Sequence, residues 1–218
     1  MGSGGYSLGD PITSTTMTTE IDITLNGEER TFEAKRSDSL LDVLRKNGYT
    51  GAKRGCDTGA CGFCTVVVDG DPVNSCVQPI TNADGATVET IEGLGTQSDL
   101  HPVQQAFVDN FALQCGFCIP GMIMRSKAFL EANPDPTEAE VREGLSENLC
   151  RCTGYKKIVE AVLDAADRMD EGGDAGGQRS VATDGGRVGI MEGESSGCCG
   201  ADGECGLDGA SDVGGESR

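Results

Sequence analysis

The feature that most constrains this chain is its cysteine pattern: eight of its eleven cysteines fall into two groups of four. The first quartet has the spacing C-x4-C-x2-C with a fourth cysteine a strand length later, and comprises Cys56, Cys61, Cys64 and Cys76. The second quartet is a C-x2-C pair and a C-x-C pair separated by a helix-sized stretch, and comprises Cys115, Cys118, Cys150 and Cys152. Four thiolates that converge on one point repel one another unless a cation lies among them. Each quartet therefore predicts a metal centre.

The spacing of the first quartet is typical of plant-type ferredoxins, which bind a [2Fe–2S] cluster. Gly55, Gly59 and Gly62 stand where a loop around an inorganic core needs conformations that glycine adopts readily. Zinc is the alternative, but its ligands usually come as two C-x2-4-C pairs, so this spacing favours iron and sulfide. The second quartet alone could hold zinc equally well. Its pairs precede predicted helix starts at Pro120 and Tyr155, where the helix dipole favours a negatively charged cluster.

The chain is strongly acidic, with 17 Lys and Arg against 36 Asp and Glu and a net charge of −19. Such a surface repels phosphates, which argues against a nucleic acid partner. It favours a halophilic protein, kept soluble in high salt, over an ordinary acidic bacterial protein. No apolar run of about 18 residues predicts a membrane span, and no export signal is visible. The cysteines are therefore expected to bind metal in a cytoplasmic protein rather than to form disulfides.

Residues 20–95 have the pattern of a small α+β domain. An alternating strand is predicted first, and its apolar members are Ile21, Ile23 and Leu25. Asn26-Gly27 predicts a hairpin turn to a second strand at 31–34, and further strands are expected at 65–68, 73–76 and 88–91. A short helix ending at Asn47 is expected to be capped by Ser37 or Asp38. The inner face of this helix is predicted to comprise Leu40, Leu41 and Leu44.

Residues 96–171 change to helical periodicity and predict a compact bundle of four helices that start near Pro102, Pro120, Thr137 and Tyr155. Thr137 with Glu140 forms a capping-box signature. The predicted inner faces comprise Val103, Phe107 and Phe111 in the first helix, Val141, Leu145 and Leu149 in the third, and Ile158, Val162, Ala165 and Met169 in the fourth. This half of the chain is thus expected to be all-α.

The two ends of the chain are predicted to be disordered, since residues 1–19 are rich in Gly, Ser and Thr and residues 172–218 form an acidic, Gly-rich tail. The tail holds the three remaining cysteines, Cys198, Cys199 and Cys205. They are expected to be incidental thiols, because no apolar core surrounds them, and a metal-binding or thiol-redox element is the alternative.

Three stretches carry a resemblance to a known family: GCDTGACGFCTVVVDG (55–70), QCGFCIPGMI (114–123) and ENLCRCTGYKKIVEAV (147–162). They resemble the iron–sulfur subunit of molybdenum hydroxylases, a family that includes xanthine dehydrogenase, aldehyde oxidoreductase and aerobic carbon monoxide dehydrogenase. The resemblance covers about residues 20–170. It implies an α+β fold class, with a β-grasp, ferredoxin-like domain at 20–95 followed by an all-α four-helix [2Fe–2S]-binding domain at 96–171.

The resemblance also implies what each site binds. The first quartet would hold the [2Fe–2S] cluster distal to molybdenum, near a flavin, and the second quartet the proximal one. In the family, the residues at the positions of Gln114 and Cys152 approach the molybdopterin ring. Ile119 departs from the threonine that is usual in QCGFCTPG, which removes a hydroxyl helix cap. Molybdopterin and FAD would lie on a large and a medium partner subunit.

These observations predict an oxidoreductase subunit without catalytic residues of its own, which passes electrons from molybdopterin through two [2Fe–2S] clusters to FAD on another subunit. Ile119, Met122 and Ile123 are candidates for contact with the molybdenum subunit, with core packing as the alternative. Phe63 and Phe117 are expected to cover the clusters rather than to relay electrons, and the single histidine, His101, is expected to cap a helix. A free-standing ferredoxin-like carrier and a zinc-stabilised interaction module remain the rival interpretations.

Overall fold

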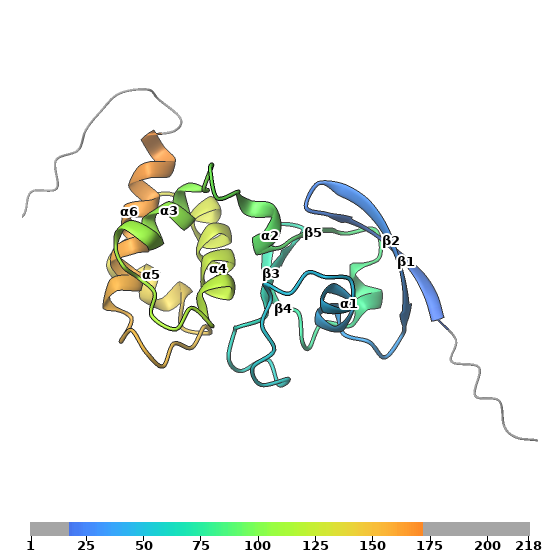
Figure 1. Cartoon of the computed structure of the whole chain (residues 1–218). Helices are drawn as coiled ribbons and strands as arrows, with labels where there is room; N and C mark the ends of the chain where they lie inside the picture. The colour runs from blue at the N-terminus through green and yellow to red at the C-terminus, as the bar shows by residue number, and fades with distance from the viewer. Residues whose placement is uncertain (1–17, 172–218) are drawn as a thin grey trace, which may run out of the picture. The chain divides into compact units, whose positions relative to one another are not determined.

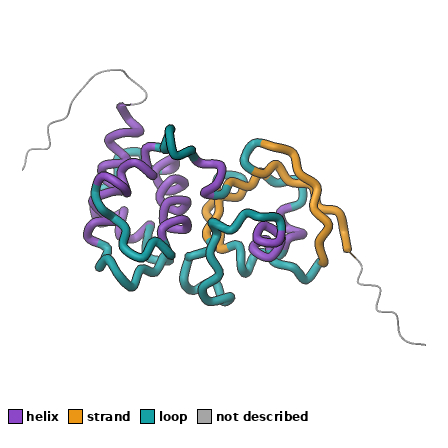
Figure 2. Tube along the Cα trace, viewed as in Figure 1, coloured by secondary structure: helices purple, strands orange, loops and turns teal. Residues whose placement is uncertain are grey.

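A computed structural model of the chain describes residues 18–171 (Figures 1 and 2). The first part contains the strands β1 (Thr18–Leu25), β2 (Glu28–Lys35), β3 (Thr65–Val68), β4 (Asp71–Asn74) and β5 (Thr87–Glu89), with helix α1 (Leu40–Lys46) and the 3-10 helix η1 (Ile80–Ala83). The second part contains the helices α2 (Ile91–Leu94), α3 (Pro102–Asp109), α4 (Ile119–Ala132), α5 (Glu138–Gly144) and α6 (Lys156–Glu171). The predictions for the N-terminal segment up to residue 17, and for the tail with Cys198, Cys199 and Cys205, lie outside the described residues.

The strands form one five-stranded mixed sheet in the order β2-β1-β5-β3-β4, in which β1 and β5 run parallel and the other neighbouring pairs antiparallel. The predicted hairpin between β1 and β2 is confirmed. Asn26 and Gly27 both have positive φ, 52° and 83°, as a two-residue type I′ turn requires. β1 begins at Thr18, two residues before the predicted start of the ordered region. The predicted strand 73–76 is shifted to Asp71–Asn74, which leaves Cys76 in the following loop.

The first hydrophobic core lies between this sheet and α1. Ile21, Ile23 and Leu25 are at most 3% exposed, which confirms the alternation of β1. The prediction that Ser37 or Asp38 caps α1 was wrong, because Ser39 is the N-cap and forms a capping box with Asp42. The helix therefore begins at Leu40, and Leu40 and Leu41 are both fully buried. Asp38 instead accepts hydrogen bonds from Lys35 and Lys46.

The four predicted helices of the second part are confirmed as α3, α4, α5 and α6, and they enclose a separate core. The prediction was wrong for two residues that were expected to face inward. Phe111 is 81% exposed because α3 ends at Asp109 and the chain turns there, with a φ of 52° at Phe111. Leu149 is 49% exposed because α5 ends at Gly144. The predicted strand 88–91 also ends early, at Glu89, and Ile91 begins the short helix α2.

Helix α4 joins the two parts, since it packs against β3 (Figure 1). Its Gly121 lies against the loop that precedes β3, where a Cβ atom would come within 2.4 Å of the Gly62 carbonyl oxygen. Only a residue without a side chain permits this approach of helix to loop. The packing brings the first cysteine loop next to the start of α4. None of the helices in the described part of the chain is long and apolar enough to cross a bilayer.

Candidate functional site

The first quartet is formed by a tight loop between α1 and β3 and by Cys76, which follows β4. Asp57, Gly59 and Gly62 all have positive φ, between 58° and 77°, so the loop reverses direction repeatedly around its cysteines. Gly55 is needed for a different reason: a Cβ atom there would lie 2.3 Å from the Phe63 ring. The local backbone therefore turns repeatedly around Cys56, Cys61 and Cys64, which lie within nine residues of one another.

Within the first quartet the thiols meet in pairs. Cys56 interacts most directly with Cys61, and Cys64 with Cys76, while weaker charge interactions join Cys76 to Cys56 and Cys61. The backbone and hydroxyl of Thr58 hydrogen-bond to Cys56 and lower its pKa to about 6. Burial, together with the neighbouring Cys64, raises the pKa of Cys76 to about 11. The first quartet thus stabilises a thiolate at Cys56, whereas Cys76 favours deprotonation only when a positive charge lies nearby.

The second quartet is formed by two segments that are distant in sequence. Cys118 is the N-cap residue of α4, and Cys150 and Cys152 lie in the loop before α6. The Sγ atoms of Cys115 and Cys152 are 3.6 Å apart, and Cys118 hydrogen-bonds with Cys150. Burial first, and then Cys150, raises the pKa of Cys118 to about 12. Burial acts in the same direction on Cys150, but hydrogen bonds from Thr153 outweigh it and lower the pKa of Cys150.

The pairing of the sulfurs tests which metal the donor set fits. A structural zinc site needs four ligands around a single ion, with sulfurs at about 2.3 Å. A [2Fe–2S] cluster instead takes four thiolates on two iron atoms, two thiolates to each. Two pairs of thiols in each quartet therefore fit the binuclear cluster better than a single zinc ion.

The two quartets differ in their exposure to solvent. Cys61 and Cys64 are buried, whereas Cys115 and Cys152 are exposed, as is the neighbouring Gln114. Large apolar side chains close in sequence to the second quartet are exposed as well, and comprise Phe111, Leu113, Phe117 and Leu149. The interpretation of Ile119, Met122 and Ile123 as partner contacts was wrong, because each is at most 9% exposed and packs in the helical core.

Aromatic rings and one backbone hydrogen bond lie between the quartets. The rings of Phe63 and Phe117 meet edge to face with centroids 5.4 Å apart, one from each cysteine motif. The Leu149 N–H donates to the Cys61 carbonyl oxygen at 2.9 Å. The sequence reasoning missed Asn148, which is 1% exposed and hydrogen-bonds to the first cysteine loop. The one sequence feature that could have identified Asn148 was its position two residues before Cys150, in the motif ENLCRC.

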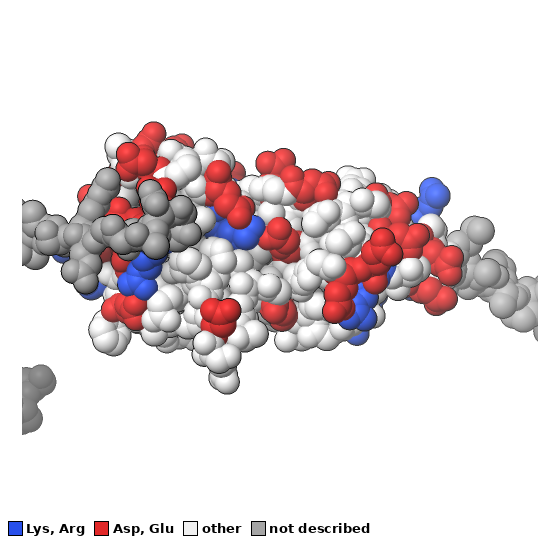
Figure 3. Space-filling view, turned by 90° about the horizontal axis from the view of Figure 1, so that it is seen from above, with Lys and Arg blue, Asp and Glu red and all other residues white. Residues whose placement is uncertain are grey.

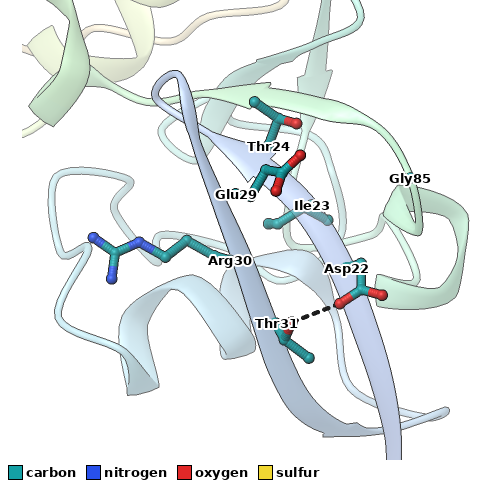
Figure 4. Close-up of a pocket in the computed structure, with 7 residues that line it drawn as sticks. All are labelled: Asp22, Ile23, Thr24, Glu29, Arg30, Thr31 and Gly85. Carbon is teal, nitrogen blue, oxygen red and sulfur yellow. Dashed lines mark hydrogen bonds between the residues drawn. The ribbon is translucent and has the colours of Figure 1, made fainter.

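A surface pocket lies on the β1–β2 hairpin (Figure 4). Its polar character comes from Asp22, Glu29, Arg30 and Thr31, and the Thr31 hydroxyl donates to Asp22 at 2.6 Å. No cysteine lines this pocket, so it is separate from the candidate metal centres. Acidic side chains are spread over both parts of the face that Figure 3 shows, with few Lys and Arg among them.

Two family models match the chain, a 2Fe-2S iron-sulfur cluster binding domain at residues 23–90 and a [2Fe-2S] binding domain at residues 90–163. Fold and cysteine sites thus define a protein with two 2Fe-2S binding domains. The nicotine 6-hydroxylase small subunit of Paenarthrobacter nicotinovorans is 50% identical over 67% of this chain and 88% of its own length. The aldehyde oxidoreductase of Megalodesulfovibrio gigas is 47% identical over 66% of this chain, but over only 16% of its own length.

A solved structure agrees with these relatives. The crystal structure of quinoline 2-oxidoreductase from Pseudomonas putida 86 matches with a TM-score of 0.68 and 42% identity, over 71% of this chain and 98% of the matched chain. The chain belongs to the small iron–sulfur subunits of the molybdenum hydroxylase family, and it is accordingly a subunit of an oxidoreductase.

Proposed function

We propose that the chain is the electron-transfer subunit of a heteromeric molybdenum hydroxylase, which relays electrons from molybdopterin to FAD. In this proposal a large partner subunit carries the molybdopterin and a medium partner subunit carries the FAD. The chain itself supplies no group that reacts with substrate. Bound in the two quartets, [2Fe–2S] clusters would accept and release single electrons.

The eight paired cysteines are the ligands in this proposal. Cys56 with Cys61, and Cys64 with Cys76, would hold the two irons of the distal cluster. In the second quartet the corresponding pairs are Cys115 with Cys152 and Cys118 with Cys150, and they would hold the proximal cluster. This pairing of thiols in twos is the observation that carries the proposal, because a zinc-stabilised interaction module would require a different grouping.

The solvent exposure of the second quartet supports its assignment to the cluster nearer to molybdopterin. Gln114 and Cys152 are exposed and free to approach a molybdopterin ring on a partner subunit. The exposed apolar side chains Phe111, Leu113 and Leu149 would be buried by that partner, in place of the core residues that the sequence indicated. The relatives support a partner as well, because one is described as a small subunit and another contains the matching segment within a much longer chain.

The division of the chain is also part of the proposal. The β-grasp domain would span residues 20–95 and the four-helix domain residues 96–171, with disordered ends, in a cytoplasmic protein. The net charge of −19 supports a halophilic protein that gains stability from screening. The melting temperature of such a protein should rise as KCl is increased from 0.1 M to 2 M, and a flat or falling curve would contradict this assignment.

Isolation of the intact complex tests the function. The chain is tagged in its native host, purified without oxygen, and examined for the metals, flavin and protein chains that accompany it. The proposal predicts molybdenum and FAD on two further chains, with iron on this one. Purification of the tagged chain alone, with both clusters, would instead indicate a free-standing ferredoxin-like carrier.

A further inference from the structure

Asn148 is a buried polar side chain that no metal centre requires as a ligand. It lies two residues before Cys150 of the second quartet, yet it donates hydrogen bonds to the loop of the first quartet and to the start of β3. Its Nδ2 atom donates to the Gly62 carbonyl oxygen at 2.8 Å and to the Thr65 hydroxyl at 3.3 Å. A buried amide that is fully hydrogen-bonded holds its partners in a defined position.

Arg125 of α4 determines which way this amide points. The Arg125 Nε atom donates to Asn148 Oδ1 at 3.0 Å, and Arg125 also pairs with Glu147 at 2.6 Å. Because a guanidinium only donates, the oxygen of the amide has to face Arg125. The NH2 group of Asn148 therefore has to face the Gly62 carbonyl.

The Gly62 carbonyl belongs to the same peptide unit as the Phe63 N–H. Burial raises the pKa of Cys61, and a hydrogen bond from this N–H to the Cys61 sulfur acts in the opposite direction. A hydrogen bond accepted at one end of a peptide polarises the unit and strengthens its N–H as a donor. The fit is close, since a Cβ atom on Gly62 would lie 2.6 Å from the Asn148 side chain and from the Glu147 carbonyl oxygen. The Thr65 N–H and hydroxyl also donate to the Gly62 carbonyl oxygen, at 3.2 and 2.7 Å, and Asn148 adds a third donor from the second cysteine motif. The Asn148 amide thus strengthens a hydrogen bond to a sulfur of the first quartet.

We propose that Asn148 is a positioning residue that holds the Gly62–Phe63 peptide with its N–H toward the Cys61 sulfur, and so raises the reduction potential of the cluster in the first quartet. Hydrogen bonds to the sulfurs favour the reduced, more negative cluster. The effect is selective for the first cluster, although Asn148 is located in the second motif. This inference rests on the proposed function, in which Cys61 is a cluster ligand.

A redox titration of the purified holoprotein, followed by EPR, tests the inference. Asn148→Leu keeps the size of the side chain but removes the donor without adding charge. We expect the first cluster of this variant to have a more negative midpoint potential and the second cluster an unchanged one. Ser126→Ala is the matched control: Ser126 is also fully buried, but its hydroxyl bonds to Met122 within α4. Both potentials of this control should equal those of the wild type.

A second variant keeps the test decisive if Asn148→Leu fails to retain the first cluster. Arg125→Met leaves the amide in place but removes the hydrogen bond that orients it, together with the ion pair to Glu147, so we expect a smaller shift in the same direction. Unshifted potentials in a variant that retains both clusters would overturn the inference, as would an equal shift of both clusters. A wild-type protein that lacks two clusters would contradict the proposed function itself, which separates the two failures.

Discussion

The two quartets reach the same donor set by different routes. The first takes three cysteines from one loop, whose turns depend on left-handed residues such as Gly59 and Gly62. The second brings together two segments separated by α4 and α5, so it depends on the packing of helices. The first is largely buried, while the second exposes Cys115 and Cys152. Local backbone turns thus place most ligands of the first site, which Asn148 and Leu149 then contact from the second motif, whereas the second site depends on helix packing throughout.

The largest expected effect is the loss of one cluster without the other. Cys64→Ser removes a thiolate from the first quartet, and we expect the iron content to fall by about half, since only one of two clusters is lost. Cys118→Ser should give the complementary result in the second quartet. EPR after reduction and iron analysis check both variants. Loss of both clusters from either variant would show that the sites do not assemble independently.

Gly62→Ala should damage the enclosed site more than a comparable change elsewhere. Gly62 has a φ of 70° and its Cβ atom would approach the Glu147 carbonyl oxygen to 2.6 Å. Gly70→Ala is the control, because Gly70 has a φ of 91° and nothing within 4 Å of the added atom. The control should lower the free energy of unfolding by about 1–2 kcal/mol through backbone strain alone. Gly62→Ala should lower it clearly more. Equal losses in urea unfolding would show that the close contact is unimportant.

The contrast in exposure predicts an order of alkylation in the iron-free chain. Cys115 and Cys152 are exposed and should react with iodoacetamide before Cys61 and Cys64, which are buried. Peptide mass spectrometry at successive times measures the order. Binding of a molybdenum subunit should slow the reaction at Cys115 and Cys152 selectively. Equal rates at all four cysteines would show that the two sites are equally open.

The smallest expected effect is the pH dependence of stability that comes from His101, the N-cap residue of α3 in the helical part of the chain. His101 accepts a hydrogen bond from the Val103 N–H through its neutral Nδ1 atom. Burial, and then the charge of Lys127, lower the pKa of His101, although Glu131 and Glu89 act in the opposite sense. The contribution of neutral His101 to the stability of the fold is therefore fully present above the ordinary histidine pKa of about 6.5. It is lost as the pH falls below that value.

Comparison of His101→Asn with the wild type isolates this contribution, since asparagine caps helices without titrating. We expect the wild type to lose up to about 1 kcal/mol more stability than the variant between pH 7.5 and pH 5. Urea unfolding at the two pH values measures the difference. Identical losses in the two proteins would show that the protonation of His101 is not linked to folding.

Much of the architecture could be predicted because its signals are local. The Asn26-Gly27 turn, the alternation of β1 and the capping box of Thr137 with Glu140 each depend on neighbouring residues only. The errors arose where tertiary packing decides. The periodicity that placed Phe111 and Leu149 inside continued beyond the ends of α3 and α5, and periodicity alone does not show where a helix stops.

The candidate site shows the same division. Spacing predicted two groups of four cysteines, and the structure brings members of each group together in pairs, while their role as cluster ligands stays a prediction. Spacing could not show that Cys115 and Cys152 are exposed, because their burial depends on how α3, α4 and α6 pack. It also could not find Asn148, whose partner Gly62 is 86 residues away in sequence.

Metal analysis of anaerobically purified protein tests the central claim most directly. With two [2Fe–2S] clusters, the chain should contain about four iron atoms and about four acid-labile sulfides, and reduction should produce two distinct EPR signals. Zinc in place of iron, or iron without labile sulfide, would contradict the account.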